Sequence, residues 1–556
     1  MTDKTLVKSD SFGHMEIDGH DAEGARITVK ADDPAYINRP NIDGAKFFVN
    51  GEIKPWNGAI QEVYAPIFLE GTTEKVLIGR QARMTPKESI EALDAAVAAW
   101  GKGNGEWAKA PMKARIQAME KFVKILKTKR DVIVNVLMWE ICKIQPDAEK
   151  EFDRTIDYIN NTIKALKELR NAENTFLNEG GVVAQVRRAP LGVMLNLGPF
   201  NYPFNETYTT LIPAILMGNS VVMKLPNVGC LAHIPTMEVF AECFPKGVVN
   251  FISGAGRETM PPIMATGLVD IFAFIGSSKA ADALIKNCPN PHKVRFCLAL
   301  DAKNLAVVMP DADLDVAVNE CVLGSLSYNG QRCTALKLIL CHNDILGDFT
   351  QKFIAKVEGL KAGLPWTKGT DITPLPEPGK PGYLEELRRD AKEKGATVVS
   401  PKGNSESGWG HTLVFPSVVY PVTSDMKVWN EEQFGPLVPI GGFSNMSEVV
   451  DYVTSSPFGQ QASIFTKGDV RQLGPLLDVL ANCVARVNIN SQCQRSPDTF
   501  PFTGRKSSAS GTLSVKDALR VMSVRTMVAT KHSNNGLVQQ VIDNKTSDFL
   551  NMEYLF

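Results

Sequence analysis

Residues 193–224 read VMLNLGPFNYPFNETYTTLIPAILMGNSVVMK, which is a β-rich run, a Gly-Pro loop, an apolar helical stretch and a second β-rich run. The alternation continues through β-rich runs at 248–252, 271–275 and 294–300, with another helical stretch at 232–244. Strands that alternate with helices predict βαβ units. We therefore expect a doubly wound parallel sheet with crossover helices, an architecture that binds a dinucleotide at the carboxyl ends of its strands.

A second α/β unit is predicted from about Lys303, where the run Asn304-Leu305-Ala306-Val307-Val308 begins, to about Pro501. Two such units place a reacting centre in the cleft between domains, a common position for ligands. Between Pro86 and Leu169 apolar residues recur at spacings of three and four, which indicates amphipathic helices. The first 44 residues are polar, so we expect an extension that wraps around the body or projects from it.

The composition is that of a large globular protein. The chain has 556 residues, 44% hydrophobic and 22% charged, with a formal net charge of -1. This charge gives no reason to expect nucleic acid or a membrane surface as a partner, and no apolar run approaches transmembrane length. Ten scattered cysteines without paired spacing indicate reduced thiols. The first residues lack an apolar signal core and carry too many acids for a typical transit peptide, so we expect a cytoplasmic location.

The run Asn329-Gly330-Gln331-Arg332-Cys333-Thr334 combines a cysteine, an arginine and a glycine turn between two apolar runs. A thiolate is a strong nucleophile, and a neighbouring cation lowers the pKa of a thiol. We therefore expect Cys333 to be a nucleophile whose pKa is lowered by Arg332. The alternative is a buried structural thiol, the commoner role of a cysteine.

Four segments resemble motifs of the aldehyde dehydrogenase superfamily, in the same order. They are 197–203 (LGPFNYP, the oxyanion loop), 221–224 (VVMK, the nucleotide-ribose strand), 330–333 (GQRC, the nucleophile run) and 432–436 (EQFGP, the nicotinamide-ribose contact). The resemblance covers about residues 45–530. It implies an α/β fold of two doubly wound domains plus a β-ribbon oligomerisation element, and a homo-oligomer that is a dimer or a tetramer.

The domain boundaries follow from this resemblance and from the pattern of elements. We expect an N-terminal extension at 1–44, a cofactor-binding domain at 45–170 and 190–301, a catalytic domain at 302–505, oligomerisation strands at 171–189 and 511–532, and a C-terminal tail at 533–556. The alternation at 181–188 and 521–530 is typical of strands.

The resemblance also implies a nicotinamide cofactor. Family members that prefer NAD commonly carry an acidic residue three positions after the lysine that matches Lys224, where its charge repels a 2′-phosphate. Here that position is the neutral Asn227, so we expect NADP. The residues expected to bind the cofactor are Lys224, Asn227, Gly254, Gly276, Ser277, Glu432 and Phe434, and no metal site is expected.

The substrate class is implied by a subgroup, the NADP-dependent non-phosphorylating glyceraldehyde-3-phosphate dehydrogenases, which hold the substrate phosphate with dispersed arginines and a tyrosine. The matching residues are Arg154, Tyr202, Arg332 and Arg495. Guanidinium groups suit phosphate, and several that converge would select a phosphorylated aldehyde. Two alternatives stay open: each arginine pairs with a nearby carboxylate, or the substrate is a semialdehyde with a carboxylate.

The mechanism implied by the family begins with attack of Cys333 on the aldehyde carbon. Asn201 and the Cys333 backbone N–H would hold the oxyanion, and hydride transfer would leave a thioester. The family hydrolyses that thioester with a glutamate 34 residues before the cysteine, but this chain has Ala299 there. In an extended segment Asp301 points to the same face as Ala299, so Asp301 could replace the base. The alternatives are that Glu432 serves as the base, that coenzyme A or phosphate accepts the acyl group, or that turnover is slow.

The sequence thus predicts an NADP-dependent aldehyde dehydrogenase that oxidises glyceraldehyde 3-phosphate to 3-phosphoglycerate without phosphorylation. One alternative is an acyl-transferring or semialdehyde-type aldehyde dehydrogenase. The other is a catalytically impaired homologue that acts in binding or as a structural protein, a role suggested by the loss of glutamate at position 299.

Overall fold

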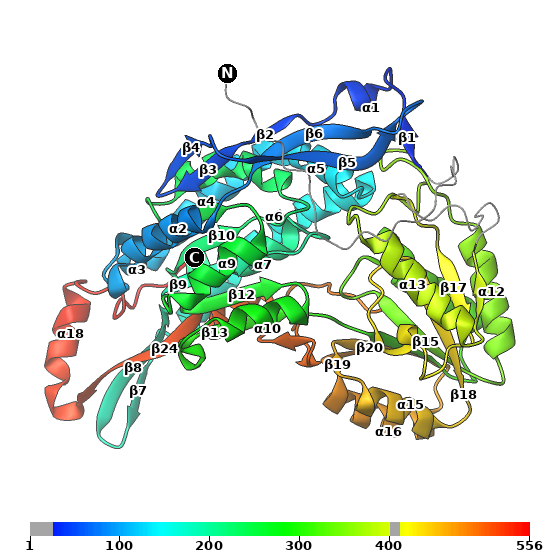
Figure 1. Cartoon of the computed structure of the whole chain (residues 1–556). Coiled ribbons are helices and arrows are strands. Elements are labelled where there is room, and N and C mark those ends of the chain that lie inside the picture. Colours follow the sequence, from blue (N-terminus) through cyan, green and yellow to red (C-terminus); the bar gives the residue numbers. More distant parts are fainter. Residues whose placement is uncertain (1–25, 401–411) are drawn as a thin grey trace, which may run out of the picture.

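Two large sheets with parallel centres and antiparallel edge strands organise the chain, whose computed structural model describes residues 26–400 and 412–556 (Figure 1). The first sheet has the order β23-β13-β12-β9-β10-β11-β3-β4. Its strands are β3 (Lys46–Val49), β4 (Glu52–Pro55), β9 (Val193–Leu197), β10 (Ser220–Lys224), β11 (Val249–Ile252), β12 (Ile271–Ile275), β13 (Arg295–Ala299) and β23 (Ala509–Ser510). The five adjacent strands β9 to β13 pair in parallel and confirm the five predicted β-rich runs.

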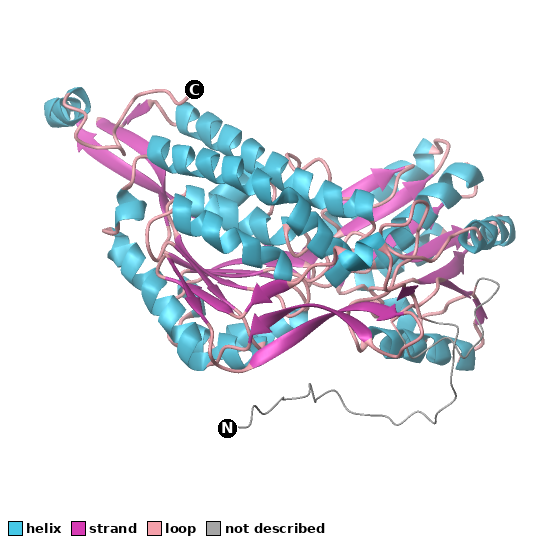
Figure 2. Cartoon of the chain, turned by 90° about the horizontal axis from the view of Figure 1, so that it is seen from above, coloured by secondary structure: helices cyan, strands magenta, loops and turns pink. Residues whose placement is uncertain are grey.

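Helices cover both faces of this sheet because its strands are apolar on both faces. Leu195, Val222 and Phe272 pack in one hydrophobic cluster with residues of α2 (Pro86–Trp100), α9 (Gly256–Ala265) and α10 (Ser278–Lys286). Their strand neighbours Met194 and Val221 pack on the opposite face. The helices there are α4 (Met112–Leu126), α5 (Arg130–Glu140), α6 (Gln145–Ala172), α7 (Asn205–Leu216) and α8 (Met237–Cys243), some of which form the layer of long helices seen from above (Figure 2).

The predicted helices are present, with one difference. The four long helices α2, α4, α5 and α6 confirm the periodicity between Pro86 and Leu169, and α7 is buried at every position. The stretch predicted as helical at 232–244 begins as the 3-10 helix η3 (Leu231–Thr236) and becomes α-helical only in α8. Pro235 lies inside η3 and has no backbone N–H to donate to an α-helical turn.

The strand order reverses beside β9. From β9 the chain builds β10 and β11 on one side, and then β12 and β13 on the other. The loop after β9 and the turn after β12 therefore leave the same edge of the sheet at a topological switch point, where open α/β sheets bind ligands. Asn201 lies in the first of these loops, and Gly276 and Ser277 lie in the second.

The second sheet belongs to the domain that carries Cys333. Its order is β16-β17-β18-β15-β14-β20-β21, and all pairs except β16–β17 are parallel. The strands are β14 (Asn304–Val308), β15 (Leu336–His342), β16 (Thr397–Val399), β17 (Ser417–Tyr420), β18 (Leu437–Phe443), β20 (Gln461–Phe465) and β21 (Arg486–Ile489). The fold is thus α/β with two parallel-sheet domains, as predicted.

The part of the predicted N-terminal extension that the structure describes wraps around the body. Strands β1 (Thr28–Val29) and β2 (Ile42–Gly44) flank the hairpin of β5 (Ile60–Leu69) and β6 (Lys75–Ala82) in a four-stranded sheet, with α1 (Pro34–Ile37) between them. Secondary structure therefore begins within the segment predicted as an extension. Residues 1–25 lie outside the described residues.

A three-stranded sheet projects from the body at the lower left of Figure 1. It has the order β24-β8-β7, with β7 (Phe176–Glu179), β8 (Val182–Pro190) and β24 (Ser523–Lys531). It contains most of both segments predicted as strands from their alternation, but the helix α17 (Val515–Val521) occupies the residues before β24. After α18 (Asn535–Asp543) the tail returns to the body, where Asn171 and Leu555 exchange two hydrogen bonds of 2.8 Å. Arg187 is fully buried and donates to the Asp548 carbonyl.

The turn after β11 supplies a stability prediction. Gly254 has φ +96°, and a Cβ there would lie 2.6 Å from the Met84 carbonyl oxygen, so Gly254→Ala should destabilise the fold by about 1–3 kcal/mol. At Gly256 the nearest atom to a Cβ is the Lys224 Cε at 3.9 Å, which makes Gly256→Ala the matched control. Thermal unfolding of the two variants checks this. Equal melting temperatures would contradict it.

Candidate active site

Cys333 lies in a strained loop between α11 (Leu314–Leu326) and β15. The three residues Tyr328, Asn329 and Gly330 all have positive φ, at 49°, 55° and 71°. Three hydrogen bonds with Thr373 lock Asn329. The Asn329 amide donates to the Thr373 carbonyl at 2.9 Å and to its hydroxyl at 3.1 Å, and Asn329 Oδ1 accepts from the Thr373 backbone N–H at 3.0 Å. Non-glycine residues in this conformation cluster at functional sites, where the surrounding structure fixes them. The loop thus presents a half-buried Cys333 in a fixed position.

Two side chains donate hydrogen bonds to the backbone carbonyl of Cys333. Asn304 and Lys337 donate to the Cys333 carbonyl at 2.8 Å and 2.9 Å. Lys337 also donates to Glu432 Oε1 at 2.6 Å, so one ammonium group links the nucleophile to the residue expected at the nicotinamide ribose. Lys337 was not predicted from the sequence. The feature that could have identified Lys337 is its position in β15, where a lysine interrupts a strand that is otherwise apolar.

The charge state of Cys333 differs from the expectation. Burial raises the pKa of the Cys333 thiol, and the Glu206 carboxylate adds to the rise, while Lys337 and Arg495 oppose it. Arg332 does not activate the thiol, because its guanidinium points away and donates to the Gly324 carbonyl at 2.8 Å and to Gln492 at 3.2 Å. The prediction that Arg332 lowers this pKa was wrong, since adjacent residues need not direct their side chains to the same point.

The loop after β9 meets the nucleophile loop through Asn201. The Asn201 side-chain amide donates to the Gln331 carbonyl at 2.7 Å, two residues before Cys333. The predicted oxyanion donor and the predicted nucleophile are therefore brought together from positions more than a hundred residues apart in the chain. The turn of the chain at this point is tight, because a Cβ on Gly198 would collide with Thr207.

A buried ion pair holds the Asn201 loop in place. Lys143 and Glu151 form a salt bridge and both side chains are 0% exposed. Lys143 donates to the Asn201 carbonyl at 2.8 Å, and its ammonium lies 3.4 Å from the Tyr202 ring centroid. Glu151 accepts from the first backbone N–H groups of α7, at Phe204 and Asn205, at 3.0 Å and 3.1 Å. The pair thus fixes both ends of the segment 201–205.

Neither member of this pair was predicted from the sequence. Lys143 precedes α6 and gives no signal in the sequence. Glu151 lies in the second turn of α6, and its place on the buried face of this amphipathic helix, beside Ala148 and Phe152, is the signal that could have identified it. The same lysine faces the Tyr328 ring at 4.6 Å, which connects the support to the strained loop before Cys333.

The cofactor side of the site is built at the ends of β10, β11 and β12. Lys224 ends β10 and donates to Asn227 Oδ1 at 2.7 Å, and burial lowers the pKa of Lys224 to about 8. Ser277 caps α10 by accepting from Ala280 N, at the turn that also contains Gly276. Lys224, Asn227, Gly254, Gly276 and Ser277 thus all lie at the carboxyl edge of the first sheet.

The two candidate bases have partners. Asp301 accepts from both the backbone N–H and the hydroxyl of Ser278, which places its carboxylate at the N-terminus of α10. Glu432 accepts from Lys337 and from Ala302 N, and burial raises the pKa of Glu432 despite Lys337. Phe434 follows, with its ring 5.9 Å from that of Phe200. Of the two carboxylates, Glu432 is the one whose charge contributes to the raised pKa of the Cys333 thiol, although its effect is smaller than that of Glu206.

The arginines of the expected phosphate site have carboxylate partners in two of three cases. Arg154 donates twice to Asp498, at 2.8 Å and 2.6 Å, and Arg495 pairs with Glu206 and with Asp498. This is the alternative left open by the sequence. Burial raises the pKa of the Tyr202 hydroxyl, and the charges of Arg332 and Arg154 both oppose the rise, so these two arginines lie on the Tyr202 side of the site.

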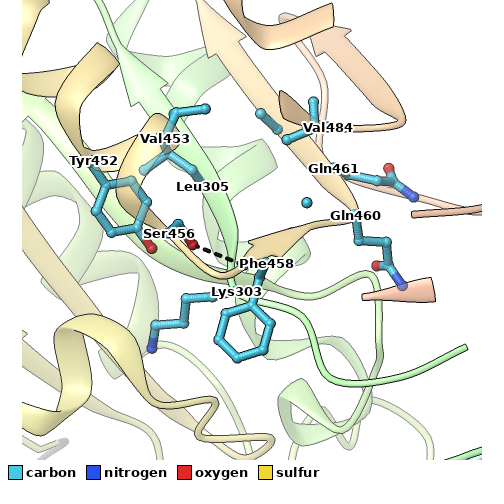
Figure 3. A pocket seen from close by; sticks show the side chains of 11 residues that line it. Lys303, Leu305, Tyr452, Val453, Ser456, Phe458, Gln460, Gln461 and Val484 are labelled. Atoms are coloured by element: carbon cyan, nitrogen blue, oxygen red, sulfur yellow. Dashed lines mark hydrogen bonds between the residues drawn. The ribbon is translucent and has the colours of Figure 1, made fainter. Parts of the chain in front are cut away.

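A separate narrow pocket lies behind the site, between β14, β20 and the end of α15 (Met446–Ser455) (Figure 3). Lys303 lines it and donates to the Glu431 carbonyl at 2.6 Å and to Gln433 at 2.7 Å. None of the predicted site residues lines this pocket, so it is not the reacting centre.

Three further properties of the described residues concern metal binding, membrane insertion and disulfides. The described residues contain no group of three or more His, Cys, Asp or Glu side chains placed to hold a metal ion. Within 26–400 and 412–556 none of the helices combines the length and the apolar character needed to cross a membrane. All ten cysteines of the chain are free thiols.

Comparison with known proteins identifies the family. The family model of the aldehyde dehydrogenase family matches residues 67–528, and the chain belongs to that family. The chain is 33% identical to an NADP-dependent glyceraldehyde-3-phosphate dehydrogenase of Streptococcus equinus, covering 86% of this chain and 96% of that protein. It is 31% identical to the wheat (Triticum aestivum) protein of the same name, covering 86% and 94%.

A solved structure is similar over the same extent. It is the NADP-dependent glyceraldehyde-3-phosphate dehydrogenase from Bacillus halodurans, complexed with NADP. The TM-score is 0.79 at 29% identity, covering 88% of this chain and 99% of that chain.

The buried ion pair gives a second prediction. Lys143→Met leaves Glu151 charged and buried without its partner, so it should destabilise the protein by about 3–5 kcal/mol. Lys150→Met, at an exposed position of α6 next to Glu151, is the control and should change the free energy of unfolding by about 0.5 kcal/mol or less. Thermal unfolding measures both. A Lys143→Met variant as stable as Lys150→Met would contradict the supporting role.

Lys337 gives a third prediction, on pH dependence. A cation favours the thiolate, so Lys337→Met should raise the pKa of Cys333 further, by about one unit, and slow its alkylation about tenfold at a pH below that value. The rate of iodoacetamide labelling is measured against pH, after subtracting the rate of a Cys333→Ser variant. Lys352→Met, at an exposed lysine of the same domain, is the control. An unshifted profile in Lys337→Met would refute the electrostatic role.

Proposed function

We propose that this protein oxidises glyceraldehyde 3-phosphate to 3-phosphoglycerate without phosphorylation, with NADP as the cofactor. The observation that carries the proposal is the meeting of the Asn201 loop with the Cys333 loop, next to Tyr202, where burial raises the pKa of the hydroxyl and the charges of Arg332 and Arg154 oppose the rise. The names of the Streptococcus and wheat relatives support the same substrate and cofactor.

The residues at the cofactor side fit NADP. Lys224 is a buried cation whose amide partner Asn227 is neutral, and the salt bridges among the described residues give Lys224 no carboxylate. A buried cation without an opposite charge is costly, and a ribose or phosphate oxygen would stabilise it. NADP, when bound, supplies the hydride acceptor. Lys224 and Asn227 would hold its ribose, and Gly276 and Ser277 would lie beside its pyrophosphate at the N-terminus of α10.

The chain's own groups account for the first half of the reaction. The Cys333 sulfur attacks the aldehyde carbon to form a carbon–sulfur bond, and the carbonyl oxygen gains the negative charge. Asn201 and the Cys333 backbone N–H donate to that oxygen. Because burial raises the pKa of Cys333, the thiol needs to lose its proton before or during attack, and Lys337 favours the thiolate.

Hydrolysis of the thioester needs a base in place of the glutamate absent at Ala299. We propose Asp301 or Glu432, and Glu432 is the better supported because Lys337 donates both to Glu432 Oε1 and to the Cys333 carbonyl. A raised pKa also suits a general base that works near neutral pH. Since both carboxylates already have partners, transfer of the acyl group to coenzyme A or phosphate is the second candidate.

The cytoplasmic location and a homo-oligomer assembled through β7, β8 and β24 belong to the same proposal. The exposed apolar side chains Leu177, Val524 and Met527 on these strands support the second point.

The fourth prediction tests the function. Rapid mixing of enzyme, NADP and glyceraldehyde 3-phosphate, without added phosphate or coenzyme A, should give a burst of about one NADPH per site and then a steady rate. Glu432→Gln should keep the burst and lower the steady rate by about 10²-fold or more, and Asp301→Asn should lower it less.

Cys333→Ser should abolish the burst, whereas Cys243→Ser, at the other half-buried cysteine, should leave it intact. A burst followed by a stall that coenzyme A or phosphate relieves would assign the acyl-transfer reaction instead. No burst from the wild-type enzyme would exclude this substrate.

A further inference from the structure

A chain of alternating charges lies beside the nucleophile. It runs from Arg154 to Asp498, from Asp498 to Arg495, and from Arg495 to Glu206. The first contact is the bidentate pair, and the second joins Arg495 Nε to Asp498 Oδ1 at 3.3 Å. The side chains of Arg495 and Glu206 are 5% and 8% exposed, so this end of the chain is desolvated.

Two arginines and two carboxylates give this cluster no net charge. A phosphate dianion entering it would meet the repulsion of Glu206 and Asp498 as well as the attraction of Arg154 and Arg495. In a site with little water, the repulsion and the attraction are of similar size when the carboxylates and the arginines lie at similar distances from the phosphate. Without substrate, the two arginines are therefore neutralised by Glu206 and Asp498, and the cluster has no excess positive charge for a substrate anion.

Of the two carboxylates, Glu206 is the one that can be exchanged. Asp498 contacts both arginines and Arg154 depends on it for two hydrogen bonds, so Asp498 joins the two. Glu206 contacts only Arg495 within this cluster, and Arg495 keeps Asp498, the Leu513 carbonyl at 3.4 Å and the Phe502 ring at 4.5 Å without it.

The position of Glu206 makes the exchange relevant to substrate. Glu206 lies in the first turn of α7, directly after the Asn201 loop, and its backbone N–H donates to the Tyr202 carbonyl at 3.1 Å. Its negative charge is also the one that acts most strongly on the Cys333 thiol. Glu206 thus contacts the arginine expected to hold the substrate's anionic group and is close enough to the nucleophile to raise its pKa.

We propose that Glu206 determines substrate specificity by occupying the place on Arg495 that the substrate's anionic group takes, so that an anionic aldehyde binds by displacing the Glu206 carboxylate. This inference rests on the proposed function, because it assigns Arg495 to the substrate. It makes Glu206 a built-in competitor that weakens the binding of a phosphate group and leaves the binding of uncharged aldehydes unaffected.

The fifth prediction uses Glu206→Gln, which keeps the shape of the side chain and removes its charge. The KM for glyceraldehyde 3-phosphate should fall about tenfold, and the KM for glyceraldehyde should change less than about twofold. Binding of inorganic phosphate, measured by calorimetry without cofactor or aldehyde, should tighten about tenfold as well. Glu168→Gln, at an exposed residue near the C-terminal end of α6, is the control. It should change neither the KM for glyceraldehyde 3-phosphate nor the affinity for inorganic phosphate.

Glu206→Leu is the second variant, for the case that the amide disturbs the fold, and should shift phosphate affinity in the same direction. Unchanged or weaker phosphate binding in a folded Glu206 variant would overturn the inference, even if the wild-type enzyme oxidises glyceraldehyde 3-phosphate. Tighter phosphate binding in a protein that does not oxidise this aldehyde would uphold the role of Glu206 and refute the proposed substrate. The two failures are therefore distinguishable.

Discussion

The hydrogen bond from the Asn201 side chain to the Gln331 carbonyl joins the two domains at the reacting centre. One partner belongs to the loop after β9 and the other to the strained turn before Cys333. The geometry on each side depends on buried groups: Lys143 and Glu151 hold the Asn201 loop, and Asn304 and Lys337 hold the Cys333 carbonyl. Preorganised donors of this kind are what stabilises an oxyanion, because they need no rearrangement when charge develops.

Burial governs the electrostatics of the site as much as charge does. The same desolvation raises the pKa of Cys333 and Glu432 and lowers that of Lys224. Each charged group in such surroundings needs an opposite charge or several hydrogen bonds. This requirement explains why Arg154 and Arg495 have carboxylate partners, and why Lys337 lies between Glu432 and the nucleophile.

Much of the fold was predictable because its signals are local. Strands β9 and β12 begin and end where the apolar runs do, and the loop after β9 follows from Gly198 and Pro199. Lys224, Gly254 and Gly276 also lie at the carboxyl edge of the first sheet, where a dinucleotide was expected. Lys143, Glu151, Lys337 and Glu206 were missed, because a charged residue in an amphipathic helix or strand gives no sign of where its side chain points until the other elements pack on it.

The sequence by itself determined the α/β alternation, the nucleophile run around Cys333 and the loss of the glutamate at Ala299, since each depends on the identity and order of neighbouring residues. Only the tertiary structure decided the charge partners. Arg154 and Asp498 are 344 residues apart in the chain, and Arg495 and Glu206 are 289 apart. Such pairs form only where folding brings buried charges together, because the cost of leaving a charge unpaired in the interior exists only once that interior has formed.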